Sequence, residues 1–111
     1  MPSELRADLV VVLEDDAGMP VMGIIVEVQL RKDRDQLFVW PLVQAALRAR
    51  LRCPCCVLVV TPSPVVARWA ERLVSTGQPG VSFRPRVLGP ARLPRDVTAE
   101  AARDNTELAA G

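Results

Sequence analysis

One carboxylate and one amide interrupt the otherwise apolar stretch GIIVEVQL at residues 23–30, where Glu27 and Gln29 stand two residues apart. A stretch this apolar predicts a strand inside a sheet, and side chains two apart on a strand share one face. Burying an unpaired charge on that face would be costly. We therefore expect Glu27 and Gln29 to have either charged partners or a role in chemistry.

A third candidate, Asp8, lies in a second apolar stretch, RADLVVVL at residues 6–13. The acidic segment EDDAGMP that follows it contains Gly and Pro, which predicts a turn. The two apolar stretches should therefore form an antiparallel hairpin. If the turn is centred between Ala17 and Gly18, Asp8 faces Glu27 across the hairpin. The same register makes three other pairs: Val10 with Ile25, Glu14 with Val21, and Arg6 with Gln29.

Two carboxylates that face each other destabilise a sheet, so this pairing needs a reason. A divalent cation would supply one, because it prefers oxygen ligands and neutralises both charges. Spacing alone equally allows ion pairs in place of a metal: Asp8 with Arg6 or Arg34, and Glu27 with Arg31.

The rest of the sequence predicts an α/β domain with a mixed sheet, in which helix–strand crossovers follow the hairpin. Trp69 and Leu73 should point inward. The expected elements are a helix from Asp33 or Asp35 to about Leu51, an apolar strand at 56–62 covered on both faces, a helix at 65–75 capped by Ser63, an edge strand at 81–88 interrupted by Pro85, and a helix at about 98–110.

The composition bounds the function classes. A chain of 111 residues suits a single domain, residues 1–111, and its net charge of +1 gives no overall attraction to nucleic acid or membrane. The chain has no histidine, which excludes Ser-His and Cys-His nucleophile systems. No stretch approaches the ~20 apolar residues of a membrane span, and no secretory signal opens the chain. The clustered cysteines of CPCC favour a reduced, cytoplasmic protein.

An Asp strand, an acidic Gly-bearing turn and an apolar strand ending in Glu-x-Gln together resemble the PD-(D/E)XK nuclease superfamily. The pattern is similar in particular to the Rpn-type, transposase-associated branch, in which Glu-x-Gln replaces Glu-x-Lys. The matching residues are Asp8, Glu27 and Gln29, and the likeness extends over about residues 6–88.

The resemblance implies a restriction-endonuclease-like core and Mg²⁺-dependent hydrolysis of DNA. Asp8 and Glu27, with the backbone carbonyl of Val28, would hold the ion, and Gln29 would orient the attacking water. Because an amide carries no charge, the cationic help usual at that position would come from residues next in sequence, which would also contact the nucleic acid: Arg31, Lys32 and Arg34.

An alternative is an inactive, shortened nuclease-like remnant that serves as a binding or dimerisation module. Family members usually begin with a helix before the Asp strand, whereas only residues 1–5 precede that strand in this sequence. Without such a helix one sheet face would be poorly covered, which favours a homodimer.

Other chemistry-bearing residues have ordinary structural explanations. Cys53, Cys55 and Cys56 lack a second ligand pair for zinc, so they predict a helix-to-strand junction with small buried thiols. The two tryptophans, Trp40 and Trp69, lie on apolar helical faces and should be core. The basic pairs Arg48 with Arg52 and Arg84 with Arg86 each share a face. Phosphate contact is open for both pairs, beside the simpler interpretation of solvated surface.

Overall fold

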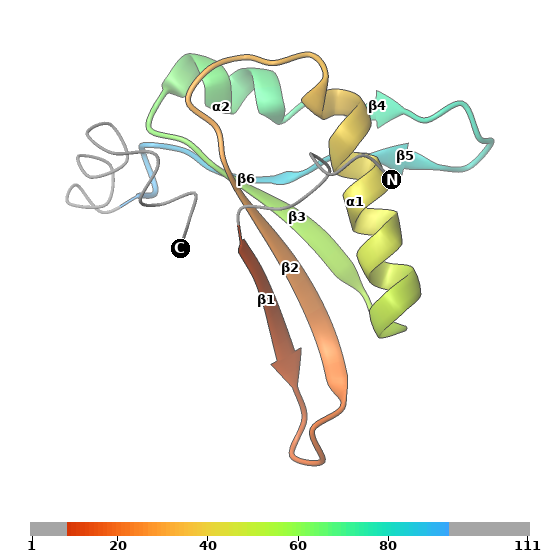
Figure 1. The fold of residues 1–111 in the computed structure, drawn as a ribbon. Helices are drawn as coiled ribbons and strands as arrows, with labels where there is room; N and C mark the ends of the chain where they lie inside the picture. The colour runs from red at the N-terminus through yellow and green to blue at the C-terminus, as the bar shows by residue number, and fades with distance from the viewer. Residues whose placement is uncertain (1–8, 94–111) are drawn as a thin grey trace.

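The computed structural model describes residues 9–93 as one four-stranded sheet, two helices and a small two-stranded ribbon (Figure 1). The elements in chain order are β1 (Leu9–Glu14), β2 (Pro20–Val28), α1 (Gln36–Leu51), β3 (Cys55–Val60), α2 (Pro64–Ala70), β4 (Val74–Ser75), β5 (Ser82–Phe83) and β6 (Arg86–Leu88). Three predictions fall outside the described residues: the structure of Arg6, that of Asp8 and the helix expected at 98–110.

The main sheet has the order β1-β2-β3-β6 and is mixed, as the sequence predicts. β1 and β2 form the antiparallel hairpin, and β2, β3 and β6 run parallel to one another. Helix α1 connects β2 to β3 and helix α2 follows β3, so the two crossovers of the expected α/β fold are present. Pro85 breaks the predicted strand 81–88 into β5 and β6, and β6 lies at the sheet edge as expected.

The hairpin register is the predicted one along most of its length. Val10 pairs with Ile25 and Leu9 pairs with Val26. The predicted pairing of Glu14 with Val21 is wrong, because a register shift after Leu13 pairs Glu14 with Pro20. In the turn itself the Asp15 carboxylate accepts hydrogen bonds from the backbone N–H groups of Ala17 and Met19, at 2.9 and 3.0 Å. A local turn network thus displaces the ladder by one residue at the hairpin end.

Helix α1 occupies the predicted range and ends at the predicted residue, Leu51. Asp35 takes the N-cap position without a side-chain hydrogen bond, while Asp33 Oδ1 accepts from the Asp35 N–H at 3.1 Å. Pro41 lies inside the helix, where it lacks the N–H that would donate to the carbonyl of the preceding turn. Arg52 closes the helix in the left-handed conformation, with φ of 59°, and its N–H donates to the Arg48 carbonyl.

Helix α2 is shorter than predicted. Ser63 Oγ accepts from the Val66 N–H at 3.2 Å, as expected, and Pro64 takes the first helical position. The helix ends at Ala70 rather than at Ser75. Val74 and Ser75 instead form β4, which pairs with β5. Leu73, expected to point inward, is 66% exposed. Residues 76–81 form the loop of this ribbon.

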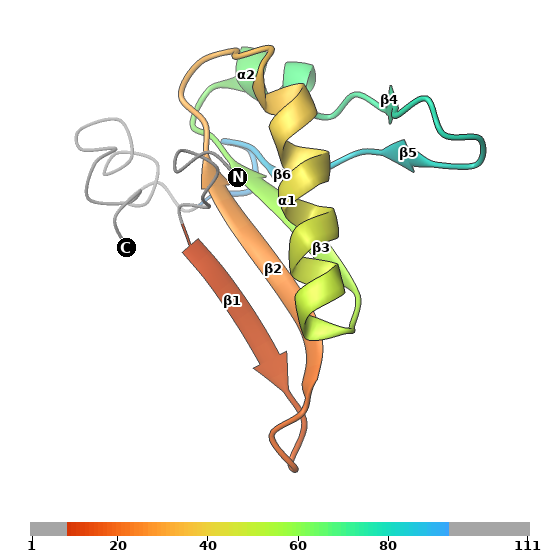
Figure 2. The same cartoon turned by 45° about the vertical axis from the view of Figure 1, so that its right-hand side comes forward.

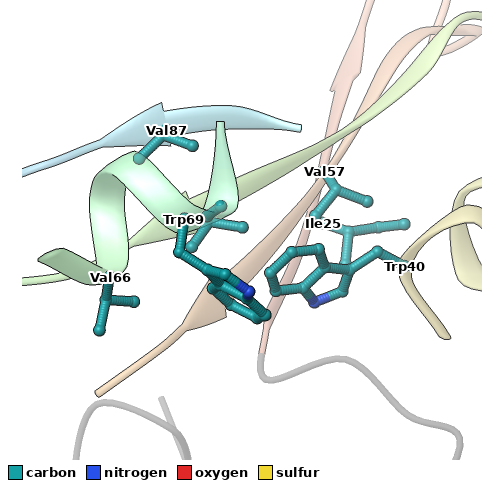
Figure 3. Packing of buried hydrophobic residues seen from close by; sticks show 8 residues of the cluster. Ile25, Trp40, Val57, Val66, Trp69 and Val87 are labelled. Carbon is teal, nitrogen blue, oxygen red and sulfur yellow. The ribbon is translucent and has the colours of Figure 1, made fainter. Parts of the chain in front are cut away.

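The core lies between the sheet and the two helices, which cover the same face (Figure 2). Trp40 of α1 and Trp69 of α2 meet there, and Figure 3 shows them beside Ile25 and Val57 of the sheet. Both tryptophans are core residues, as predicted. The Nε1 of Trp40 is buried without a hydrogen-bond partner among the described atoms.

The opposite face of the sheet carries a continuous aliphatic surface. We call this the open face, because no described helix covers it; the sequence instead favoured cover on both faces of β3. The ladder pairs place side chains from all four strands on it, and these are half-buried or exposed: Leu9, Val11, Leu13, Met22, Ile24, Val26, Val28, Cys56, Leu58, Val60 and Leu88. Arg86 is the charged residue that the same ladder places at its margin.

Candidate functional site

Three polar residues gather, buried, where the parallel strands β2 and β3 end. Glu27 is 8% exposed, Gln29 is 9% exposed, and Thr61 is fully buried. Parallel strands bring their carboxyl ends to one edge of a sheet, which is where open α/β sheets bind ligands. The cluster therefore lies where the fold favours a site.

The backbone explains why these residues meet. Glu27 pairs with Val59 in the β2–β3 ladder, and the Gln29 N–H continues the pairing by donating to the Val60 carbonyl at 2.9 Å. Thr61 follows β3 directly, and its N–H donates to the Leu88 carbonyl of β6 at 3.1 Å. The cluster is thus held by ladder hydrogen bonds from three strands. Glu27 and Gln29 share the face that the helices cover, as their spacing predicts.

Side-chain hydrogen bonds orient the two neutral members. Gln29 Nε2 donates to the Arg31 carbonyl at 2.8 Å, which assigns the amide orientation and turns the chain after β2. Thr61 Oγ1 accepts from the Ser63 N–H at 3.2 Å, next to the start of α2. The remaining acceptor capacity of Gln29 is its Oε1, an atom suited to hold a water.

Sequence reasoning missed Thr61. It follows the apolar run CVLVV and precedes Pro62, so a polar residue that ends a buried strand was the signal that could have identified it. Its hydroxyl adds an oxygen beside the predicted pair.

The second predicted carboxylate, Asp8, lies outside the described residues, which begin at Leu9 one position later. Within residues 9–93, no group of three or more His, Cys, Asp or Glu side chains comes together as metal ligands. The described part of the site thus supplies one carboxylate, that of Glu27, and the polar residues Gln29 and Thr61 at the same end of the sheet.

The predicted basic residues follow the site in the connector to α1. Arg31, Lys32 and Arg34 are all exposed. Their position after Gln29 leaves their charges in solvent beside the carboxyl end of β2. An exposed basic connector can approach a phosphate without first being desolvated.

The cysteines form a junction between α1 and β3, as predicted. All three are free. The predicted burial holds for Cys53 and is wrong for Cys55 and Cys56, which are half-buried. Cys55 Sγ lies 3.5 Å from the Cys53 carbonyl, to which it donates. Burial raises the pKa of the Cys55 thiol above its ordinary value, and the neighbouring Cys53 raises it further. At neutral pH this thiol is protonated, which makes it a poor nucleophile.

The basic pair Arg48 and Arg52 lies at one cavity of about 660 Å³ beside the cysteine junction. Gln44 also lines this cavity, and its Nε2 donates to the Cys55 carbonyl at 2.9 Å. The structure therefore brings this predicted pair together, at the end of the sheet opposite to Gln29.

Comparisons with known proteins give no match: no family model matches the chain, and neither a curated protein nor a solved structure does. No helix in residues 9–93 has the length and apolar character to cross a membrane. Functional conclusions therefore depend on the fold and on the residues at the carboxyl end of β2.

Proposed function

We propose that this chain is a nuclease-like domain of the PD-(D/E)XK type that hydrolyses phosphodiester bonds of DNA with Mg²⁺. The observation that carries the proposal is the hairpin register, in which Val10 pairs with Ile25. Continued by two residues, the same register would bring Asp8 opposite Glu27. The mixed sheet, the hairpin and the parallel strands that follow support a restriction-endonuclease-like core.

The donor set suits the ion. Mg²⁺ prefers oxygen ligands, and Glu27, Gln29 and Thr61 are buried oxygen-bearing residues at the carboxyl ends of β2 and β3. Asp8, Glu27 and the Val28 carbonyl would hold the ion. When bound, Mg²⁺ supplies charge stabilisation at the phosphate and lowers the pKa of a bound water.

The chain's own residues do the positioning. Gln29, fixed through its Nε2 to the Arg31 carbonyl, orients the attacking water through Oε1. Arg31, Lys32 and Arg34 stand exposed in the connector, where they attract the DNA backbone and supply the positive charge that Gln29 lacks. In this proposal the protein acts in the cytoplasm, in keeping with its free cysteines.

The test is nicking of supercoiled plasmid by purified protein with Mg²⁺. Glu27→Gln keeps the volume of the buried side chain and removes its charge, so it should abolish nicking while the circular dichroism spectrum is unchanged. Glu14→Gln, at the exposed hairpin turn, is the matched control and should cut as the wild type does. Equal nicking by wild type and Glu27→Gln would identify a contaminant and remove the support.

A second candidate, a non-catalytic dimerisation module, is favoured by the open face. That face is aliphatic across four strands, and apart from Arg86 at its margin no charged side chain of the described ladder lies on it. Two copies could therefore meet face to face without burying an unpaired charge. The aliphatic open face therefore supports the homodimer that the sequence predicts, which we propose as the second candidate.

Sedimentation equilibrium tests the homodimer. Wild type should sediment as a dimer, and Val26→Lys, at the centre of the open face, should sediment as a monomer with unchanged secondary structure. Val21→Lys, on the exposed start of β2, is the control and should remain dimeric. A monomeric wild type would contradict the dimerisation module and end this candidate.

A further inference from the structure

Three arginines line a single cavity at the outer edge of the sheet. Arg84, Arg86 and Arg92 surround a volume of about 530 Å³, together with Pro85, Val87 and the end of α2 at Glu71. An adjoining cavity of about 270 Å³ shares Arg92 and Glu71 and adds Arg68. None of these residues belongs to the cluster at Glu27 and Gln29.

The backbone holds the first two arginines in a regular arrangement. Arg86 is fixed in β6 by its pairing with Leu58. Pro85, which is buried, restricts Arg84 to β or polyproline II conformations, so the chain stays extended between β5 and β6. Residues two apart on an extended chain are separated by about 6.6 Å, and Arg84 and Arg86 line the same cavity. That separation is close to the spacing of successive phosphates along a nucleic-acid strand.

The third arginine is positioned by a tight turn. The N–H of Arg92 donates to the Gly89 carbonyl at 3.0 Å, and the N–H of Leu93 donates to the same carbonyl at 3.1 Å. Gly89 itself packs against α2: a Cβ at this position would lie 3.0 Å from the Ala67 Cβ. A glycine therefore allows the turn to approach the helix closely, and this contact carries Arg92 to the cavity.

The cavity is electropositive, although the whole chain carries a net charge of only +1. Glu71 is the one carboxylate residue that lines it beside three arginines. Among residues 9–93 the structure shows no ion pair to any of the three guanidinium groups. All three arginines are exposed, and exposed guanidinium groups are suited to bidentate contact with phosphate oxygens.

We propose that Arg84, Arg86 and Arg92 bind backbone phosphates of DNA, beyond the nucleotides at the Glu27 site. This inference rests on the proposed function for its ligand. β6 lies two strands from β2, about 10 Å across the sheet, so one DNA molecule can reach both places. The linear arrangement of Arg84 and Arg86 matches a chain of phosphates rather than one free phosphate ion.

Binding of a fluorescent 20-base-pair duplex, measured by anisotropy in EDTA, tests the proposal without cleavage. Arg84→Ala with Arg92→Ala leaves every strand of the sheet intact. This variant should bind about tenfold more weakly than wild type, and the slope of log K against log salt should decrease by about 1.8, since each phosphate contact contributes about 0.9.

Two further variants make the test specific. Glu71→Gln removes the carboxylate from the same cavity and should tighten binding. Arg50→Ala with Arg72→Ala removes an equal charge from two exposed arginines that do not line the cavity, and it should leave the salt slope nearly unchanged. Equal weakening by the two double variants would mean that total charge alone governs binding, and would overturn the proposal.

The outcomes separate this inference from the nuclease proposal. A wild type that binds DNA through these arginines but never nicks plasmid would contradict the proposed catalysis and leave the phosphate site standing. If about 10 mM inorganic phosphate displaced no DNA from wild type, the linear site would be supported further. Displacement by phosphate at micromolar concentration would point to a single-ion site and contradict the linear one.

Discussion

Trp40 and Trp69 meet edge to face, with ring centroids 5.9 Å apart and ring planes at 60°. One ring comes from α1 and the other from α2, and both rest on the β2–β3 part of the sheet (Figure 3). This contact joins the two crossover helices to each other as well as to the sheet. The stability of the helical layer should therefore depend on it.

Trp69→Ala should lower the free energy of unfolding by about 3–5 kcal/mol, because it removes a large buried side chain and leaves a cavity. Trp69→Phe should cost less, since an aromatic edge remains to face Trp40. Urea denaturation followed by circular dichroism measures both changes. Equal, small effects of the two substitutions would contradict a packing role for the tryptophan pair.

Gly23→Ala should destabilise the fold by about 1–3 kcal/mol through overpacking. A Cβ at this position would lie 2.8 Å from Cys55 Sγ and 3.0 Å from Leu47 Cδ2 of α1. Cys55→Ala removes the closest of these atoms, so the double variant should be less destabilised than the sum of the single variants. Additive losses in urea denaturation would show that Gly23 matters for another reason.

Gln29→Lys should raise the rate of plasmid nicking several-fold if the proposed chemistry holds. Lysine would bring to this buried position the positive charge that stabilises a developing phosphoryl charge. Gln29→Ala removes both the water-orienting oxygen and the donor to the Arg31 carbonyl, so nicking should decrease by about tenfold or more. Unchanged nicking in both variants would exclude Gln29 from the reaction.

The Cys55 thiol should titrate at higher pH in the folded protein than in the unfolded chain, because burial and then Cys53 raise its pKa. The folded state thus holds this proton more tightly. The associated stabilisation is complete below the pKa of the unfolded chain and is lost as the pH rises through the folded pKa.

Alkylation of a Cys53→Ala, Cys56→Ala variant, in which Cys55 is the remaining thiol, measures this shift from about pH 7 to about pH 10. The midpoint should lie higher without urea than with it, since burial is the largest cause and stays in place. Identical midpoints would show that Cys55 is solvated in the folded protein.

The hairpin was predictable because a Gly-bearing turn between two aliphatic runs permits few registers, and the pairing of Val10 with Ile25 agrees with the prediction. The end of α2 was not predictable from local pattern. Leu73 and Val74 continue the apolar spacing of the helix. The pairing of Val74 with Phe83 is a contact between residues distant in sequence, which local propensity does not predict.

Some residues of the candidate site were likewise predictable from the sequence and others were not. Glu27 and Gln29 were identifiable because a charge and an amide contradict an apolar strand, and both are buried. Thr61 and the cavity at Arg92 could be identified only from the folded structure. β3 and the turn after β6 bring these residues next to others that are remote in sequence. The spacing of Arg84 and Arg86 was evident in the sequence, whereas their meeting with Arg92 in one cavity was not.

Pro85 has a consequence for local opening of the molecule. By separating β5 from β6 it leaves β4 and β5 as a ribbon of two-residue strands that extends away from the main sheet (Figure 1). A two-stranded ribbon is marginally stable by itself. In native-state hydrogen exchange its amides should lose protection in minutes at low denaturant, while those of β2 and β3 should exchange only with global unfolding.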